Sequence, residues 1–542
     1  MKAGAVRGTV GRVASLAGSV GAGAGLAAVL VGLAVESVSA GETRAHTFTV
    51  DTIIAEGDAA FEGQDITVVD CTLTVEGDHD FGAVEIEGAN GVLVYDGDSL
   101  GVTSAVVRDG GSLDLAGGSQ LAVTNELRVQ PGSEVVGRAK DTDVQVGGEW
   151  AGAGVTIEAA TVNVEANAAI TANGRGYTGV DGGPGNGPGG GDAYGGGGHG
   201  GVGGRDTGGG AYGESLEPAT LGSAGGSGRA GEVGASGGGA LRLQATDLTV
   251  DGTMQVNGAG TFFWYAGGGA GGSIWIDIDR LTGAGTIQAN GGTVSANGSC
   301  GGGAGGRIRI TYTDSMTLPG ANVAAAGGWG PRGTGHAGTV AIMDRSAGAD
   351  DLHIHTSFSI EPGRAFTMNS VTLHGGTTEL GGGATLDAGT ALTLDGTAKL
   401  VVQCRNLEPV PAGRATWVGE GATIKATALT VGAESAIVAG GQGYRGNDGA
   451  AGDGPGGGEG YGGAGHGGTG ANNGGLPYGD SLQPTAPGSA GGSGREGYAG
   501  PRGGGAIRIE TNAITIDGTV SANGDNGGSW YTGAGAGGSV WI

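Results

Sequence analysis

The feature that most constrains the fold of this chain is an internal duplication. Tyr212-Gly213-Glu214-Ser215-Leu216 recurs as Tyr478-Gly479-Asp480-Ser481-Leu482, 266 residues later, and the same spacing relates Arg242 to Arg508. Each repeat holds a strand-rich block followed by a glycine-rich block. Repeats of this kind stack along one direction and bury a continuous core, so the length of the chain does not predict a number of globular domains.

The strand-rich blocks alternate apolar and polar residues over short distances, with Gly, Asp or Asn between most of the apolar pairs. These pairs include Val84/Ile86, Leu113/Leu115, Leu127/Val129, Val371/Leu373 and Leu392/Leu394. A period of two places one row of side chains inward, as in β-strands. Many short strands fit a sandwich, a propeller or a solenoid. Because no regular Asn-Gly hairpin series occurs in these blocks, we expect an all-β fold whose body is a right-handed parallel β-helix, or β-solenoid.

Glycine accounts for 133 of the 542 residues, and both glycine-rich blocks begin with a glycine at every third position. The two series are Gly176, Gly179, Gly182 and Gly185 in the first repeat, and Gly443, Gly446, Gly449 and Gly452 in the second. Three residues per turn is the period of the polyproline II helix, and glycine allows backbones to approach closely. A disordered linker is the alternative. Since the flanking motifs stay in step between the repeats, we expect ordered, glycine-rich polyproline-II-like layers interleaved with the β-helix.

The N-terminus has the pattern of an export signal. Lys2, Arg7 and Arg12 precede an apolar stretch, and Val38-Ser39-Ala40 supplies the residues expected before a cleavage site. A membrane anchor is the alternative, but the strongly apolar run is short for a span. We therefore expect an exported chain, extracellular or at the cell surface, with no membrane span in its mature part.

These patterns divide the chain into five parts. We expect a signal peptide (1–40), a first β-helix block (41–172), a first glycine-rich block with returning strands (173–351), a second β-helix block (352–438) and a second glycine-rich block (439–542). The last block stops inside a strand motif. We expect it to be incomplete, or to associate with another molecule, including a second copy, through an open C-terminal end.

The net charge of -27 repels nucleic acids, so we expect no nucleic-acid partner and at most weak binding of divalent cations. Cys71, Cys300 and Cys404 are far apart and odd in number, which predicts neither a disulfide framework nor a zinc site. No glycine run is followed by Gly-Lys-Ser or Gly-Lys-Thr, the signature of a phosphate-binding loop. No cofactor is expected.

The glycine-rich blocks carry an ordered set of motifs. In the first repeat these are His199-Gly200-Gly201, Tyr212-Gly213, Gly225-Gly226-Ser227-Gly228, Gly237 to Leu243 and Gly252 to Gly258, and the second repeat has the same set between His466 and Gly524. The set resembles a family of large, glycine-rich extracellular proteins. The strand-rich blocks resemble, more generally, the passenger stalks of bacterial surface β-helix proteins. The resemblance implies a surface or matrix role and no reaction.

The repeated histidines and tyrosines are the first candidate site residues. His199 and His466 stand among glycines without other ligands at metal spacing, so we expect structural roles for them. We expect the same of Tyr212 and Tyr478, whose rings would pack over the glycine layers.

Two aromatic pairs are candidates for binding. Trp264-Tyr265 and Trp530-Tyr531 are either a platform that stacks on glycans or a cap over the apolar end of each block. His353 with His355, and Asp277 with Asp279, each share a strand face. Metal binding is the alternative to a solvated face for both of these pairs.

The sequence thus favours a secreted or cell-surface structural or adhesive repeat protein without catalytic activity. The alternatives are a carbohydrate-binding module and a carbohydrate-active β-helix enzyme, either a polysaccharide lyase or a glycosidase. Such an enzyme needs a groove with clustered carboxylates, whereas the carboxylates here are scattered along the sequence. Expected partners are surface glycans or the extracellular matrix.

Overall fold

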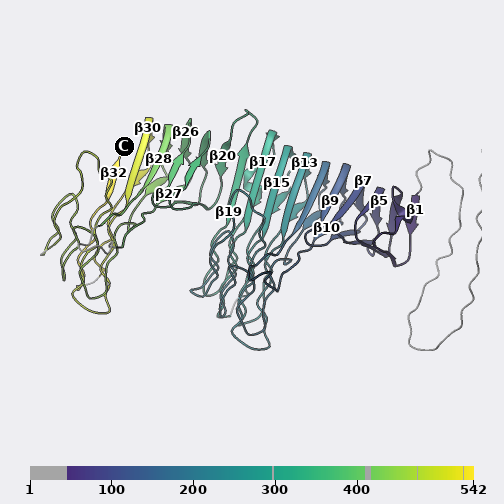
Figure 1. Ribbon diagram of the computed structural model, residues 1–542, viewed down its shortest axis with the longest axis horizontal. Helices are drawn as coiled ribbons and strands as arrows, with labels where there is room; N and C mark the ends of the chain where they lie inside the picture. The colour runs from purple at the N-terminus through teal and green to yellow at the C-terminus, as the bar shows by residue number, and fades with distance from the viewer. Residues whose placement is uncertain (1–44, 296–297, 409–416, 473, 529) are drawn as a thin grey trace, which may run out of the picture. The chain divides into compact units, whose positions relative to one another are not determined.

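The computed structural model describes residues 45–295, 298–408, 417–472, 474–528 and 530–542 (Figure 1). The expected signal peptide, 1–40, lies outside these residues. Within them, no helix combines the length and apolar character needed to cross a membrane. The two helical elements are single 3-10 turns, η1 (Ala59–Phe61) and η2 (Gly320–Asn322).

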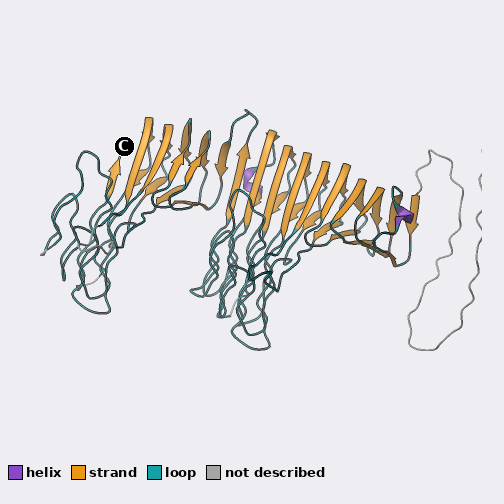
Figure 2. Cartoon of the chain, viewed as in Figure 1, coloured by secondary structure: helices purple, strands orange, loops and turns teal. Residues whose placement is uncertain are grey.

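The described strands form three sheets of 18, 9 and 5 strands (Figure 2). The largest sheet contains β1 (Ala45–Phe48), β3 (Asp65–Val69), β5 (His79–Glu87), β7 (Ser99–Arg108), β9 (Gln120–Val129), β11 (Val155–Val164), β13 (Ala240–Val250), β15 (Ser273–Thr282), β17 (Arg307–Met316), β19 (Thr339–Asp344), β20 (Asp351–Ile354), β22 (Ala365–Thr367), β23 (Ser370–Leu373), β25 (Thr385–Asp387), β26 (Ala391–Leu394), β28 (Ala422–Val431), β30 (Ala506–Ile516) and β32 (Ser539–Trp541). The second sheet contains β2 (Thr52–Ile54), β4 (Thr72–Glu76), β6 (Val92–Asp96), β8 (Ser112–Leu115), β10 (Glu134–Gly137), β12 (Ala169–Thr171), β14 (Thr253–Gln255), β16 (Thr286–Gln288) and β18 (Val323–Ala324). The third contains β21 (Phe358–Ile360), β24 (Thr377–Leu380), β27 (Lys399–Val402), β29 (Ala436–Val438) and β31 (Thr519–Ser521).

Strands that are next but one along the chain pair in parallel, which is the connectivity of a parallel β-helix. β3 pairs with β5, β5 with β7 and β7 with β9 in the largest sheet, while β4, β6 and β8 pair in the second. Successive coils therefore stack in register, and each coil hydrogen-bonds to the next. The predicted all-β fold, built from stacked parallel strands, is confirmed.

The core consists of columns of aliphatic side chains, one residue from each coil. One column through β9, β11, β13, β15, β17 and β19 contains Leu121, Ile157, Leu243, Ile276, Ile310 and Ile342. All of these side chains are buried. Because each column contributes one residue per coil, a thin core suffices.

The core of the β-helix is divided into two large clusters, and a separate small cluster contains Tyr177, Leu221 and Ala240. The first extends from Phe48 to Ile342 and the second from Ala341 to Ala522. They meet where β19 pairs antiparallel with β20, with Ile342 opposite His353. The other strand pairs in the described part of the chain are parallel.

The glycine-rich segments are excursions from single coils of the β-helix. β11 pairs directly with β13, although the first glycine-rich segment separates them in the sequence. β28 pairs with β30 around the second glycine-rich segment in the same way. In Figure 1 both segments extend as long loops from the same side of the largest sheet. The coils on either side of each excursion therefore anchor both of its ends.

The backbone hydrogen bonds inside these excursions have a period of three. In the segment 267–272, residues three positions apart donate to the same neighbouring segment. The bonds are Gly267 to Gly226 and Ala270 to Ser223, Gly268 to Gly301 and Gly271 to Ala304, and Gly269 to Ala259 and Gly272 to Val256. A helix with three residues per turn and no internal hydrogen bonds presents its N–H groups in three directions. The segment 267–272 is therefore a polyproline-II-like helix packed between three neighbours. The predicted series of every third glycine is interrupted, because Gly182 and Gly449 have positive φ angles of 62° and 61°.

Candidate functional site

The repeated histidine and tyrosine of the first repeat fix one glycine layer to the next. The His199 side chain is fully buried; its Nδ1 atom lies 2.8 Å from Gly271 O and its Nε2 atom 2.8 Å from Thr220 Oγ1. A carbonyl can only accept, so Nδ1 carries the proton and Nε2 accepts from the threonine hydroxyl. Burial, reinforced by the nearby Arg307 charge, lowers the pKa of His199 to about 3. The neutral ring is a structural hydrogen-bonding group.

Tyr212 lies beside this histidine, with ring centroids 4.8 Å apart. Its hydroxyl donates to Leu221 O and accepts a 2.8 Å hydrogen bond from Ser223 Oγ. Burial raises the pKa of this phenol. The two hydrogen bonds of this hydroxyl therefore hold the segment around Leu221 against the layers.

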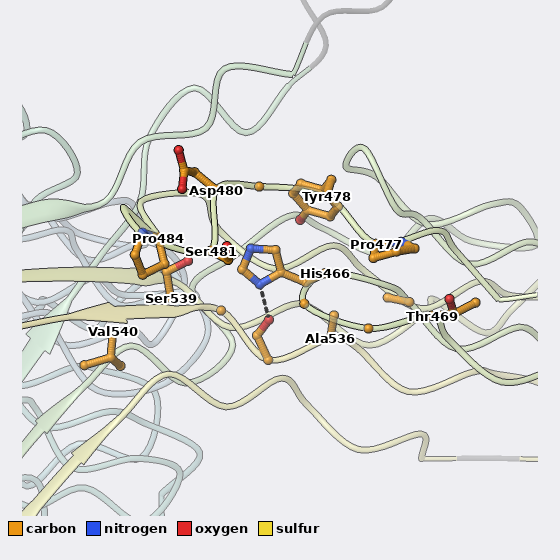
Figure 3. Close-up of a pocket in the computed structure, with 16 residues that line it drawn as sticks. His466, Thr469, Pro477, Tyr478, Asp480, Ser481, Pro484, Ala536, Ser539 and Val540 are labelled. Atoms are coloured by element: carbon orange, nitrogen blue, oxygen red, sulfur yellow. Dashed lines mark hydrogen bonds between the residues drawn. The ribbon is translucent and has the colours of Figure 1, made fainter.

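The second repeat rebuilds this arrangement. His466 Nδ1 lies 2.9 Å from Gly537 O, and Tyr478 donates a 2.5 Å hydrogen bond to Pro487 O. One partner differs, because Ala486 stands at the position of Thr220. Here the histidine is not enclosed, and it lines an open pocket with Tyr478 (Figure 3).

Aromatic and guanidinium groups from two glycine-rich segments, 173–239 and 256–272, come together in a cluster that we call the first tip (Tyr194, Arg229, Trp264 and Tyr265). The rings of Tyr194 and Tyr265 lie 5.7 Å apart, and the Arg229 guanidinium lies 5.2 Å from the Tyr265 ring. The indole of Trp264 is 59% exposed beside them. Phe262 and Phe263 precede it and are also exposed.

The second tip (Tyr461, Arg495, Trp530 and Tyr531) has the same composition at the corresponding positions. Arg495 lies 4.6 Å from the Tyr531 ring, which in turn lies 5.1 Å from the Tyr498 ring. Trp530 is 98% exposed. In both tips, therefore, the tyrosine of the predicted Trp-Tyr pair packs into the layer while the tryptophan faces solvent.

Backbone contacts hold the first tip in place. Trp264 O accepts from Ser299 N and from Cys300 Sγ, both at 3.1 Å. The Tyr265 amide donates to Glu232 Oε2 over 3.1 Å. The exposed indole thus stands on a backbone that neighbouring segments fix.

Sequence reasoning identified the Trp-Tyr pairs but missed the groups that accompany them. Arg229 with Arg495, and Tyr194 with Tyr461, occupy corresponding positions in the two repeats. Their recurrence was a signal available from the duplication itself. Trp329 is also exposed.

The remaining candidate pairs have ordinary structural partners. His353 Nδ1 lies 3.0 Å from His374 Nε2, and His355 stacks on His374 with 4.5 Å between ring centroids, so this strand face is covered by another histidine. Asp277 lies 3.8 Å from Arg309, and Asp279 accepts from Thr313 Oγ1 over 2.5 Å. Throughout the described ranges, no three His, Cys, Asp or Glu side chains are arranged to hold a metal ion.

Comparisons of this chain with protein-family models, with curated proteins and with solved structures find no match.

Proposed function

We propose that this protein is a secreted or cell-surface structural and adhesive protein that binds surface or matrix glycans through the two tips. The observation that carries the proposal is the exposure of Trp264 and Trp530, one at each tip, on backbone that is otherwise packed. Exposed apolar groups that are held in place mark interaction sites. Tryptophan, tyrosine and arginine are also the residues that contribute most to binding interfaces.

The chemistry of the tips suits a saccharide. An indole face offers apolar area to the C–H groups of a sugar ring, and the tyrosine and arginine beside it offer hydrogen bonds to hydroxyl groups. Arg495 also provides a positive charge on a chain of strongly negative net charge, whereas Arg229 lies 4.0 Å from the carboxylate of Glu232. We therefore expect the second tip to prefer glycans that carry carboxylate or sulfate groups.

Rigidity supports an adhesive role. Neighbouring segments fix the backbone of the first tip before any ligand binds, so binding there does not require ordering of the loop. The titratable residues that recur, His199 and Tyr212, are committed to hydrogen bonds within the layers. The resemblance of the glycine-rich blocks to extracellular proteins points to the same location, and we assign no reaction to the chain.

Glycan binding by the tip variants tests this proposal. The intact protein, Trp264→Ala, Trp530→Ala and the double variant are applied to an array of neutral and acidic glycans, and affinities for the best ligands follow from titration. We expect each single change to weaken binding by about tenfold or more, and the double change to abolish it. Circular dichroism should remain unchanged, because both indoles are exposed.

Val50→Ala is the matched control, since Val50 is also an exposed apolar residue and lies outside the tips. It should bind as the unaltered protein does. Glycan binding that survives in the double tryptophan variant would contradict the proposal. Depolymerisation of any arrayed polysaccharide would contradict it too, in favour of a carbohydrate-active β-helix enzyme.

A further inference from the structure

A groove crosses the outer face of the largest sheet in the first repeat. It runs over β9, β11, β13 and β15, which lie side by side in Figure 1, and its volume is ≈ 530 Å³. The strand register is irregular here, because β11 is shifted against β9 between Ala159 and Thr161. Such a β-bulge bends a strand and re-aims its side chains. The groove therefore follows the stack of coils and crosses the strands.

One wall of the groove is a row of side chains that stand in register on successive coils. Glu158 of β11 lies opposite Ala122 of β9 and Gln244 of β13. Gln244 in turn lies opposite Asp277 of β15. Farther along β13, Thr246 also lines the groove. The lining thus combines two carboxylates, an amide and a hydroxyl on one continuous strip.

The side chains in the middle of this wall have no partner within the described part of the chain. Glu158 and Gln244 form no side-chain hydrogen bond or ion pair with the residues that the structure describes. The second repeat differs, because β28 and β30 place Lys425 opposite Glu510, and these two side chains form a 3.1 Å ion pair. The same place on the sheet is thus satisfied by its own charges in the second repeat and left available in the first.

Buried polar atoms without partners adjoin the β15 end of this row. Trp275 Nε1, Arg309 Nε and Thr311 Oγ1 are buried and have no hydrogen-bond partner among the described residues. Thr311 lies directly opposite Asp277, the last residue of the row. Trp275 and Arg309 form the neighbouring pair on the same two strands. Since nearly every buried polar atom in a protein is hydrogen-bonded, this end of the groove has unused capacity for a polar ligand.

A chain of sugar units matches this lining. A hydroxyl group both donates and accepts hydrogen bonds, so sugar hydroxyls can donate to Glu158 and Asp277 and accept from the amide of Gln244. Successive coils are about 4.8 Å apart, so a linear chain along the groove meets a new side chain of the row at each coil.

The groove is less suited to a peptide or to an acidic chain. An extended peptide binds a sheet through main-chain donors and acceptors at a free edge, whereas β9, β11, β13 and β15 are each paired on both sides. The carboxylates of Glu158 and Asp277, together with the net charge of -27, disfavour a polyanion.

We propose that this groove binds a linear, uncharged oligosaccharide, with Glu158, Gln244 and Asp277 as the residues that contact it. The site is separate from the two tips and does not depend on them. It belongs to the first repeat alone, because the Lys425–Glu510 ion pair occupies the corresponding place in the second.

Isothermal titration calorimetry of the full chain tests the proposal with three neutral hexasaccharides, of β-1,4-linked glucose, α-1,4-linked glucose and β-1,4-linked mannose, and with hexagalacturonate as the acidic probe. We expect saturable binding of at least one neutral probe and binding of hexagalacturonate that is at least about tenfold weaker. Glu158→Gln should weaken binding of the neutral probe by about tenfold. The double change Glu158→Lys with Gln244→Glu, which copies the ion pair of the second repeat, should abolish it and leave the melting temperature unchanged.

Glu126→Gln is the matched control, because Glu126 is a half-buried carboxylate on β9 that lies outside the groove. This variant should bind the neutral probe as the unaltered protein does, and so should the protein with both Trp264→Ala and Trp530→Ala. Absence of saturable binding of all three neutral probes at millimolar concentration would overturn the proposal. So would tighter binding of hexagalacturonate, or neutral binding that survives the groove changes and is lost in the double tryptophan variant, which would place the sugar at the tips.

Discussion

The Nδ1 atom of His199 lies 2.8 Å from the carbonyl oxygen of Gly271, which is 72 residues away in the sequence. This bond connects two polyproline-II-like layers, and it requires a neutral ring whose Nε2 atom accepts from Thr220. Protonation would place a buried charge beside Arg307 and would remove that acceptor. The first excursion therefore depends on an uncharged imidazole.

Acid should destabilise the protein through this residue. The folded-state pKa of His199, about 3, lies below the usual value near 6.5. The stability that depends on its neutral ring is therefore fully present above pH 6.5 and is lost as pH falls toward 3. The free energy of unfolding should fall by about 1.4 kcal/mol per pH unit in this window from this group alone.

The His199→Gln variant checks that prediction. It should be less stable than the unaltered protein at pH 7, and the difference should shrink at pH 4, measured as urea midpoints. His466→Gln, at the open counterpart, is the matched comparison and should cost less stability at pH 7, because this histidine is not enclosed. An identical loss of stability between pH 7 and 4 in the unaltered protein and His199→Gln would refute this role.

Close packing of the layers predicts a sharp difference between two glycines of the first glycine-rich block. A Cβ atom on Gly267 would lie 2.0 Å from Gly195 O, and this neighbour is backbone that cannot rotate away. A Cβ on Gly210 would meet nothing within 4 Å. Gly267→Ala should therefore destabilise the protein by about 1–3 kcal/mol or more, while Gly210→Ala should be nearly neutral.

Thermal melting of the two alanine variants measures this difference. Equal melting temperatures for Gly267→Ala and the unaltered protein would show that the layers yield to an added methyl group. That result would favour loosely packed loops.

The two core clusters should respond separately to cavities. Ile276 belongs to the first cluster and Leu392 to the second, and both are fully buried. Replacing either with alanine should cost about 2–5 kcal/mol. Hydrogen exchange should accelerate mainly in the coils of the altered cluster. Equal acceleration in both clusters would show that the β19–β20 junction transmits stability between them.

The cysteines should be slow to react in the native state. Burial raises the pKa of the Cys300 and Cys404 thiols to about 11, so little thiolate is present at pH 8. Labelling with a chromogenic disulfide at pH 8 should be far slower in buffer than in urea. Full labelling within seconds in buffer would contradict the raised pKa of these two thiols.

Much of the fold could be predicted from the sequence because the relevant signals are local and repeated. Alternation in pairs such as Leu113/Leu115 predicts strands, whereas the glycine series beginning at Gly176 predicts a threefold helix that the positive φ of Gly182 interrupts. The antiparallel junction of β19 with β20 could not be predicted, because reversed pairing leaves the same alternation in Leu352 and Ile354. The division of the core into two clusters follows from that junction, so it could not be predicted from the sequence either.

The site was predicted only in part. The duplication identified Trp264 and Tyr265 as a pair, but the sequence does not show that one ring is exposed and the other packed. That difference depends on Tyr194 and Arg229, which reach the Tyr265 ring from distant segments. His353 and His355 were assigned to a solvated face because His374, the residue that covers them, comes from the next coil.

Amide hydrogen exchange, resolved to single residues, tests most directly whether the glycine-rich backbone is packed into fixed layers. Gly191, Gly225 and Gly226 donate to Ala224, Ala235 and Gly195 in neighbouring segments, so their amides should exchange at least about a thousandfold more slowly than in an unfolded peptide. Rates equal to those of an unfolded peptide at these glycines, with the strands of the β-helix still protected, would contradict the account.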